Sequence, residues 1–309
     1  MCPFVSLWLC GSNALRETEA WSRSGRVERL ARGARAAIIP AMIDGYRVID
    51  LHVHSELSGC ADKAPGYTAE LVLRHAARLG IDGVGFADHV LEPQPELPAA
   101  LVEEIGGRPG LERTRKLRGI LAGLDAPGLP PFRIGAEVDV FRPGLFAVPA
   151  AGRRELDFAA VSANHPQLAS MPAPESDEPG ALARHILEKT LSAVRSGLAT
   201  SIAHPLIPLG RARAAEAYAL LPALGAEGLF EEMRDRGVLL GFSRQLLTAQ
   251  HLARQKDAAA LYALAARVGV RLVFETDCHQ FWHMSCIVPL VELARKLGLG
   301  PERFAGELP

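Results

Sequence analysis

Seven short apolar segments, separated by helical segments, constrain the fold of this chain more than any other feature of its sequence. They cover residues 48–53, 83–87, 132–136, 156–161, 199–203, 238–242 and 270–275. The stretches between them, such as 68–79 and 181–196, repeat apolar residues at helical spacing. Regular alternation of strands and helices is typical of a parallel sheet. The sequence therefore predicts an α/β fold.

Residues that can bind a metal ion stand at or just past the ends of six of these segments. They are His52, His54, His89, Glu137, His165, His204, Asp277 and His279. An open doubly wound sheet would gather its functional residues mainly at one switch point, whereas a barrel uses the C-terminal ends of most strands. We also find no Rossmann glycine fingerprint or P-loop at any strand-to-helix turn. The pattern favours a closed or nearly closed barrel with a metal site at that face.

The first segment carries two histidines two residues apart. Side chains alternate along a strand, so His52 and His54 are expected to share one face with Asp50. Two neutral imidazoles on one face can hold a single metal ion, although an isolated pair also fits two ordinary histidines at a strand end. The eight N and O ligands exceed the needs of one ion, which indicates two or three. The carboxylate of Glu137 can bridge two ions about 3.5–4 Å apart.

Composition limits the classes of partner. At 309 residues and 49% hydrophobic, the chain can bury a large core in one or two domains. A net charge of −1 predicts no stable binding to nucleic acid or to an anionic membrane surface. Five cysteines without a CxxC pair favour a reducing cytoplasm. No apolar run approaches the roughly 20 residues that a membrane span requires.

The first 41 residues differ from the rest. They contain a short apolar run at 4–10 and then six arginines within 16–35, with little apolar periodicity. We predict a poorly ordered N-terminal extension over 1–41, a barrel domain over 42–309, and Met42 as an alternative start.

The order and local sequence of these motifs resemble the PHP family, the polymerase and histidinol phosphatase superfamily of metal-dependent phosphoesterases. The matching motifs are Asp-Leu-His-Val-His-Ser at 50–55, Ala-Asp-His at 87–89, Gly-Ala-Glu-Val-Asp at 135–139, Ser-Ala-Asn-His at 162–165, Ala-His-Pro at 203–205 and Thr-Asp-Cys-His at 276–279. The resemblance runs from about residue 46 to 300. It implies a distorted (β/α)7 TIM-like barrel with a trinuclear metal site.

The resemblance also implies a division of the ligands. His52, His54, Glu137 and Asp277 would surround the first ion, Glu137 would bridge to a second ion with His165 and His204, and His89 and His279 would serve the third. Many relatives have a further histidine six residues past the second histidine of the first motif. This chain has Cys60 there, with Asp62 just beyond. Cys60 can bind as a thiolate, Asp62 can substitute, or the third site is weak.

The implied activity is hydrolysis of a phosphoester by a metal-activated water, with zinc, manganese or iron as the ions. The expected substrate is a small phosphomonoester such as histidinol phosphate, a nucleotide or a sugar phosphate. Glu137 and Asp277 would act through the ions, and Asp88 either orients an imidazole or donates a proton. Arg142 and Arg244 are candidates for binding the phosphate, although an arginine at a strand end is more often solvated surface.

The family's histidinol phosphatases usually carry a Glu-x-Asn-like motif on the strand before the last, where this chain has Gly-Phe-Ser-Arg at 241–244. This difference disfavours histidinol phosphate as the substrate.

Three other functions are also considered from the sequence. A phosphodiesterase or exonuclease would fit the ligands but not the lack of a basic stripe. A metal-dependent amidohydrolase would commonly have a strand-end lysine, which is missing. A non-catalytic metal-binding module is disfavoured by the complete ligand set.

Overall fold

The computed structural model describes residues 43, 45–61, 66–104, 110–124, 127–163, 165, 170–205, 214–248 and 255–309. The predicted extension over 1–41, the alternative start Met42 and the alternative ligand Asp62 lie outside these ranges. No described helix is long and apolar enough to cross a membrane.

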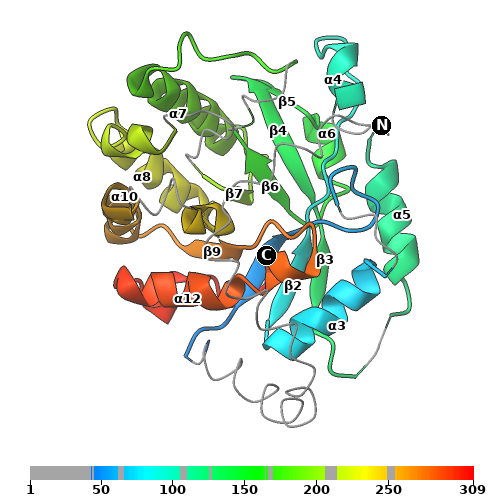
Figure 1. Ribbon diagram of the computed structural model, residues 1–309. Helices are drawn as coiled ribbons and strands as arrows, with labels where there is room; N and C mark the ends of the chain where they lie inside the picture. Colours follow the sequence, from blue (N-terminus) through cyan, green and yellow to red (C-terminus); the bar gives the residue numbers. More distant parts are fainter. Residues whose placement is uncertain are drawn as a thin grey trace.

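The described strands form one sheet with helices around its outside (Figure 1). The strands are β1 (Ile49–Val53), β2 (Gly83–Phe86), β3 (Phe132–Ile134), β4 (Ala136–Arg142), β5 (Leu145–Phe146), β6 (Ala159–Ser162), β7 (Ser201–Ile202), β8 (Leu239–Ser243) and β9 (Leu272–Glu275). Their order is β3-β2-β1-β9-β8-β7-β6-β4-β5. Neighbours are parallel except for the antiparallel β4–β5 pair. The predicted α/β class and parallel sheet are confirmed.

The sheet is curled because β3, at one edge of the sheet, continues almost directly into β4, which lies near the other edge. Only Gly135 separates β3, which pairs with β2, from β4, which pairs with β6. A parallel bridge between His89 and Glu137 also joins the chain beyond β2 to β4. This is the arrangement of a TIM-like barrel. The predicted strand over 132–136 is wrong in extent, since strand structure resumes after Gly135 and runs on to Arg142.

The helices confirm most of the predicted segments. They are α3 (Ala69–Leu79), α4 (Ala99–Glu104), α5 (Glu112–Leu121), α6 (Ala150–Arg153), α7 (Pro179–Arg195), α8 (Ala226–Arg236), α10 (Gln255–Val268), α11 (Phe281–Met284) and α12 (Ile287–Lys296), with 3₁₀ turns at Ala214–Ala219, Arg244–Leu247 and Pro301–Arg303. The short helices α4, α6 and α11 were not predicted. The alanine- and leucine-rich stretch over 214–224 favours a helix by sequence, but the structure has a 3₁₀ turn there that ends at Ala219.

Helix α3 is capped at both ends by the residues that its sequence favours there, Thr68 before it and Gly80 after it. The Thr68 hydroxyl accepts a hydrogen bond from the Leu71 amide at 3.3 Å, which satisfies one of the first free N–H groups of the helix. Gly80 ends the helix at φ 74°, a left-handed conformation that glycine adopts without steric cost.

Replacing Thr68 with alanine should therefore lower the free energy of unfolding by about 1 kcal/mol. The change leaves a helix amide without its side-chain partner. Urea unfolding followed by circular dichroism measures the difference, and Thr68→Ser, which keeps the hydroxyl, should behave like the wild type. An unchanged midpoint for Thr68→Ala would mean that the cap contributes nothing.

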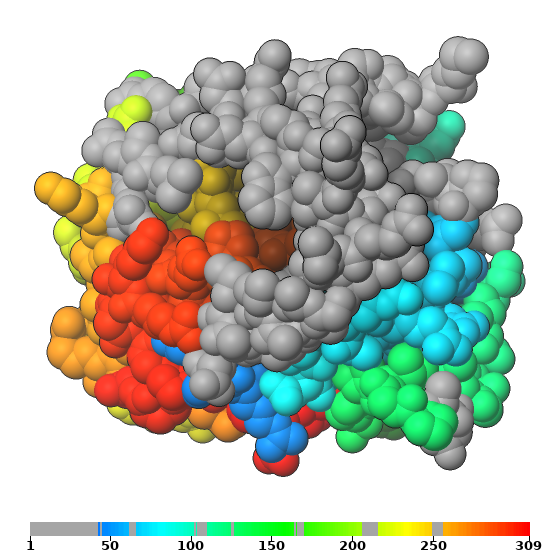
Figure 2. All heavy atoms as spheres, turned by 60° about the horizontal axis from the view of Figure 1, so that its bottom comes forward, coloured from blue at the N-terminus to red at the C-terminus, as the bar shows by residue number. Residues whose placement is uncertain are grey.

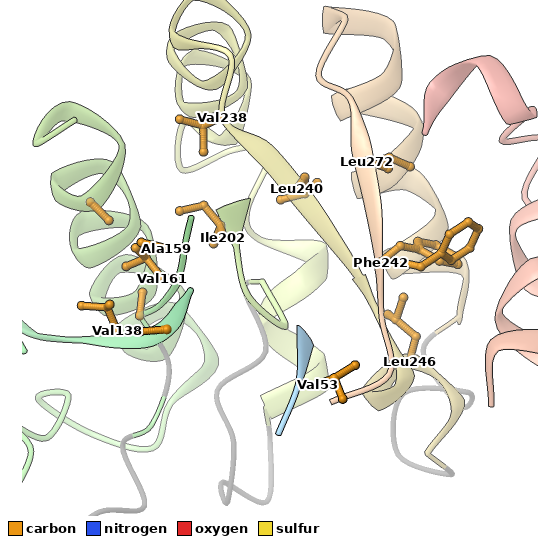
Figure 3. Close-up of a cluster of buried hydrophobic side chains, with 14 of the residues drawn as sticks. Val53, Val138, Ala159, Val161, Ile202, Val238, Leu240, Phe242, Leu246 and Leu272 are labelled. Carbon is orange, nitrogen blue, oxygen red and sulfur yellow. The ribbon is translucent and has the colours of Figure 1, made fainter. Parts of the chain in front are cut away.

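Two apolar clusters lie on opposite faces of the curled sheet. The outer cluster joins strand residues to the helices, and Figure 3 shows part of it, including Val161 and Leu240. The inner cluster contains no residue of a described helix: Ile49, Leu51, Ala87, Phe158, Ala160, Ala203, Leu239, Val273 and Ala305. Alternation along the strands explains the division, because Ala160 and Leu239 directly precede Val161 and Leu240. The inner cluster therefore fills the inside of the curl.

Phe158 is the largest side chain of the inner cluster, and two glycines make room for it. A Cβ on Gly85 would lie 2.8 Å from its ring, and one on Gly135 would lie 2.6 Å from it. Both separations are shorter than real Cβ contacts. The interior is thus narrow, and only glycine fits at these two positions.

The two ends of the described chain meet at one side of the barrel. Figure 2 shows residues near the start (blue) beside residues near the end (red). The Tyr46 ring packs edge-on against Phe304 with centroids 5.6 Å apart, and its hydroxyl donates to the Leu299 carbonyl. Strands β1 and β9, the first and last, are neighbours.

Candidate metal centre

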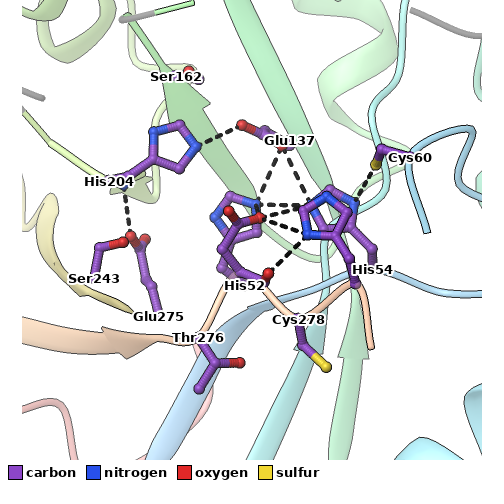
Figure 4. A network of polar contacts seen from close by, with 12 residues as sticks. His52, His54, Cys60, Glu137, Ser162, His204, Ser243, Glu275, Thr276 and Cys278 are labelled. Carbon is purple, nitrogen blue, oxygen red and sulfur yellow. Dashed lines mark hydrogen bonds and ion pairs between the residues drawn. The ribbon is translucent and has the colours of Figure 1, made fainter. Parts of the chain in front are cut away.

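The structure brings all eight predicted ligands together, and Figure 4 labels His52, His54, Glu137 and His204 among them. His52 and His54 lie at the end of β1. His89, His165 and His204 follow β2, β6 and β7, Asp277 and His279 follow β9, and Glu137 is the second residue of β4. Six of the eight side chains are buried: His52, His54, Glu137, His165, His204 and Asp277. His89 and His279 are partly exposed.

The first donor group surrounds the imidazoles of β1. The Nε2 atoms of His52 and His54 are 3.2 Å apart. Glu137 Oε2 lies 3.2 Å from Nε2 of His52 and 3.5 Å from that of His54. Asp277 Oδ1 lies 3.2 Å from His54 Nε2 and 3.7 Å from His52 Nε2. Two nitrogens and two carboxylate oxygens therefore face one point.

A second donor group uses the other oxygen of Glu137. Its Oε1 is 2.9 Å from His204 Nε2 and 3.5 Å from His165 Nε2. The two oxygens of one carboxylate thus face two sets of imidazoles. This is the disposition of a carboxylate that bridges two ions.

A third group lies at the rim. His89 Nδ1 is 3.3 Å from Glu137 Oε2. The rings of His279 and His54 stack with centroids 4.3 Å apart. Cys60 is exposed, yet its sulfur approaches His54 and His279 within 4.8 Å.

The donors fit divalent metal ions. Among the residues that the structure describes, four sets of three donors have their N, O or S atoms within 4.8 Å of one another, and Glu137 belongs to two of the sets. His52 Nδ1 is buried and has no hydrogen-bond partner among the described residues, so its ring is not held by an ordinary hydrogen bond on that side. Buried imidazoles and carboxylates aimed at each other are what zinc, manganese and iron ligands require.

Two of the ligands have unusual backbone conformations. His204 at φ 29° and Asp277 at φ 47° are the non-glycine residues with positive φ in the described part of the chain. Such conformations cost free energy and persist where neighbouring groups hold them. The His204 amide donates to Glu275 Oε2 at 2.7 Å, which fixes the turn that aims its ring at Glu137.

Sequence reasoning missed Glu275, the last residue of β9. Its carboxyl is fully buried in the barrel, where a Cβ on Gly241 would lie only 2.1 Å from Oε2. Burial raises the pKa of Glu275 to about 8. Two features of the sequence could have indicated Glu275: Gly241 in β8, and an acidic residue type two positions before Asp277.

Asp50 does not join the ligands, which corrects the expectation that it shares a face with His52. Its carboxylate accepts hydrogen bonds from the Thr276 amide at 3.0 Å and hydroxyl at 2.6 Å. The β1–β2 register shifts between Asp50 and Val53, so simple alternation fails along this strand. Burial raises the pKa of Asp50 to about 6.

Other acidic groups hold the ligands in place. Asp139 lies 2.5 Å from His165 Nδ1, on the ring edge opposite Glu137. Such a carboxylate fixes the orientation of a metal-binding imidazole. Asp88 accepts from the Ser55 amide at 2.7 Å and is 3.9 Å from His54 Nδ1. The sequence pointed to Asp88 but not to Asp139.

The two predicted phosphate-binding arginines have different surroundings. Arg142 is exposed at the end of β4, and no contact within the described ranges joins it to the ligands. Arg244 is buried, donates to the Thr276 carbonyl at 2.7 Å and lies 3.6 Å from Asp277 Oδ2. Gln245, which was not predicted, donates to the same oxygen of Asp277 at 2.7 Å.

The charged groups of the cluster shift one another's pKa values. Burial would raise the pKa of Glu137, but His89, His52 and His165 hold it well below its ordinary value. Burial would lower the pKa of His54, but contact with Cys60 and Asp277 raises it well above its ordinary value. The pKa of His89 rises to about 10 because Glu137 outweighs burial. Near neutral pH and without bound metal, the imidazoles of His54 and His89 are therefore in the doubly protonated, positively charged form.

Zinc binding at pH 7 should consequently release protons, because a ligating imidazole must be neutral. The raised pKa values of His54 and His89 mean that apparent zinc affinity should increase as the pH rises from 6 to 8. Calorimetry in buffers of different ionisation enthalpy measures the protons released. Heats that do not depend on the buffer would contradict this expectation.

The fold of this chain is similar to that of two solved structures. No family model and no curated protein match the chain. Histidinol phosphate phosphatase from Lactococcus lactis, solved with zinc, L-histidinol and phosphate, is 13% identical at a TM-score of 0.55, covering 82% of this chain and 92% of that one. A Listeria monocytogenes protein, described as a candidate histidinol phosphatase, is 13% identical at 0.53, covering 76% and 97%. At such identities the likeness is one of fold.

Proposed function

We propose that this protein is a metal-dependent phosphoesterase of the PHP superfamily that hydrolyses a small phosphomonoester. The observation that carries the proposal is Glu137, whose Oε1 faces His165 and His204 while Oε2 faces His52 and His54. Two ions joined by one carboxylate are suited to phosphate chemistry because they contact both the attacking and the leaving oxygen.

The proposal includes the barrel type. If β3 and β4 are counted as one strand bent at Gly135, the parallel strands are seven: β1, β2, β3–β4, β6, β7, β8 and β9. We therefore assign residues 42–309 to one distorted (β/α)7 barrel and retain 1–41 as an extension.

Divalent ions, when bound, would supply Lewis acidity and lower the pKa of a water. The chain's own groups hold and aim the donors. His52, His54 and Asp277 form one side, and His165 and His204 the other. Asp139 fixes the His165 ring, and Gln245 fixes the Asp277 carboxylate, so both donors are already oriented.

Substrate contacts are assigned by position. The buried guanidinium of Arg244 lies beside Asp277, where it can donate to a phosphate oxygen held at the centre. Arg142 stays a weaker prediction because its side chain is exposed. Asp88, tied to Ser55 and close to His54, is better placed to orient that ring than to donate a proton to a leaving group.

The Lactococcus structure contains zinc, L-histidinol and phosphate, which makes histidinol phosphate one substrate to test. Here β8 ends in Ser243 and is followed by Arg244 rather than by a Glu-x-Asn-like motif, so nucleotide and sugar phosphates are equally to be tested.

The test is an assay of the full chain after dialysis against a chelator. Histidinol phosphate, nucleoside monophosphates, sugar phosphates and a bis-aryl phosphodiester are each supplied with Zn²⁺, Mn²⁺ or Fe²⁺. We expect metal-dependent release of phosphate from a monoester and little from the diester. Preference for the diester, or no hydrolysis with any ion, would overturn the proposal.

A further inference from the structure

Two buried polar atoms beside the metal centre have no hydrogen-bond partner among the described residues: Nδ1 of His52 and Oε1 of Glu275. Both side chains are fully buried. An unpaired polar atom in a protein interior costs free energy, so nearly all such atoms have a protein or water partner. A ring nitrogen that carries a proton and a carboxyl oxygen can satisfy each other, directly or through water.

His52 needs an acceptor for Nδ1 once an ion is bound. Its Nε2 faces the carboxylates of the first donor group, so an ion would bind there and the neutral ring would keep its proton on Nδ1. Metal-binding imidazoles almost always donate that second N–H to a carboxylate, a carbonyl or a water. His165 Nδ1 lies 2.5 Å from an Asp139 oxygen, as this rule requires. Likewise, His279 Nδ1 lies 2.8 Å from the Asp277 carbonyl.

Glu275 lies near both His204 and His52. Its Oε2 accepts the His204 amide at 2.7 Å, which leaves Oε1 for another group. Burial raises the pKa of Glu275, and the charge of His52 opposes that rise more than any other group does, so ring and carboxyl are close. Figure 4 shows this carboxyl beside the His204 backbone and to one side of the His52 ring. The carboxylates that pair directly with the ring are Glu137 and Asp277, so Glu275 is one step further away.

We infer that Glu275 is a positioning residue for both donor groups: it holds the His204 backbone through Oε2 and the His52 ring through Oε1 and one buried water. The inference rests on the proposed function in that both groups must bind ions. A water with two polar partners spans such a gap and commonly satisfies buried groups. The link does not depend on the charge of Glu275, because the water can donate to a carboxylate or accept from a protonated carboxyl while it accepts the His52 N–H. One side chain would thus align a ligand of each ion.

Gly241 in β8 leaves the space that the Glu275 carboxyl occupies. A Cβ on Gly241 would lie 2.1 Å from Oε2 and 2.6 Å from Oε1. Unbranched side chains of similar length are therefore the substitutes that fit. Glu275→Gln keeps an acceptor for the His204 amide and a polar group for the water. Glu275→Met keeps the shape and flexibility of the side chain but removes both polar contacts.

The test is long-range ¹H–¹⁵N NMR of the zinc-loaded full chain, labelled with ¹⁵N-histidine, with the His52 signals assigned by comparison with His52→Gln. The wild type and Glu275→Gln should show His52 protonated on Nδ1, with the proton signal displaced downfield by a hydrogen bond. In Glu275→Met this signal should move upfield, and the affinity for two zinc ions should fall about 10–100-fold. Glu155→Met, the same substitution at an exposed residue, is the matched control and should change neither.

An unchanged His52 signal in Glu275→Met would overturn the inference and leave Glu275 as a partner of the His204 amide alone. The wild type by itself also decides: a zinc-bound His52 ring with no downfield Nδ1–H signal overturns the inference even if Glu275→Met does not fold, which thermal unfolding of the metal-free variant checks. A wild type that binds no zinc would overturn both this inference and the proposed function. Zinc binding without hydrolysis of any phosphate ester would overturn the proposed function alone, because the NMR readout does not depend on activity.

Discussion

If the proposed function holds, replacing Glu137 with glutamine is expected to lower phosphatase activity by about 10³-fold or more, since the carboxylate would hold both ions and the ions would stabilise the developing charge. The amide has nearly the same shape but only one oxygen, and it carries no charge. The glutamine side chain therefore cannot present an oxygen acceptor both toward His52 and toward His204. Metal analysis of the purified variant should show a loss of bound ions, and kcat measured at saturating metal should stay low.

Glu155→Gln is the matched control for this experiment. Glu155 is exposed and pairs with Arg115 at 2.8 Å, far from the metal centre. An exposed ion pair contributes little to stability, so this variant should keep both its metal content and its activity. Wild-type activity in Glu137→Gln with its ions still bound would exclude the bridging role.

Truncating Phe158 to alanine should produce the largest loss of stability, about 3–5 kcal/mol. The ring is fully buried inside the barrel and is enclosed by Gly85 and Gly135. Neither glycine has a side chain that could move into the space, so the cavity would stay largely open. Urea unfolding of the metal-free protein measures the change without a contribution from ion binding.

Phe132→Ala provides the comparison. Phe132 in β3 is only partly buried and packs against the outer cluster. Losing the same ring there should cost clearly less, because water can enter the space. Equal losses for the two variants would mean that the interior collapses around the missing Phe158 ring and that the narrow packing described for it is incorrect.

The strands and their ligand residues could be predicted because both depend on local patterns. Six of the seven apolar segments end within a few residues of a histidine or carboxylate, and parallel strands bring those ends to one face. The position of Asp50 could not be predicted, because the register shift in β1 arises from pairing with β2. Alternation within a strand is a local rule, and a neighbouring strand can break it.

The supporting residues were missed for a related reason. Asp139, Gln245 and Glu275 act on ligands that are distant in sequence, and Glu275 contacts His204 across 71 positions. Their roles exist only once the barrel has formed. Arg142 lies where the chain turns from β4 into the antiparallel β5, and its role in binding phosphate stays a prediction.

Because the first and last strands are neighbours, ions bound between them would also affect the stability of the fold. His54 and Asp277 are 223 residues apart in the chain, yet their donor atoms lie 3.2 Å apart. An ion held by both would act as a reversible cross-link that closes a loop of 223 positions in the 309-residue chain. Because the unfolded chain has no such site, the free energy of metal binding would add to that of folding. Metal supply would then determine how long the barrel stays closed as well as whether it is active.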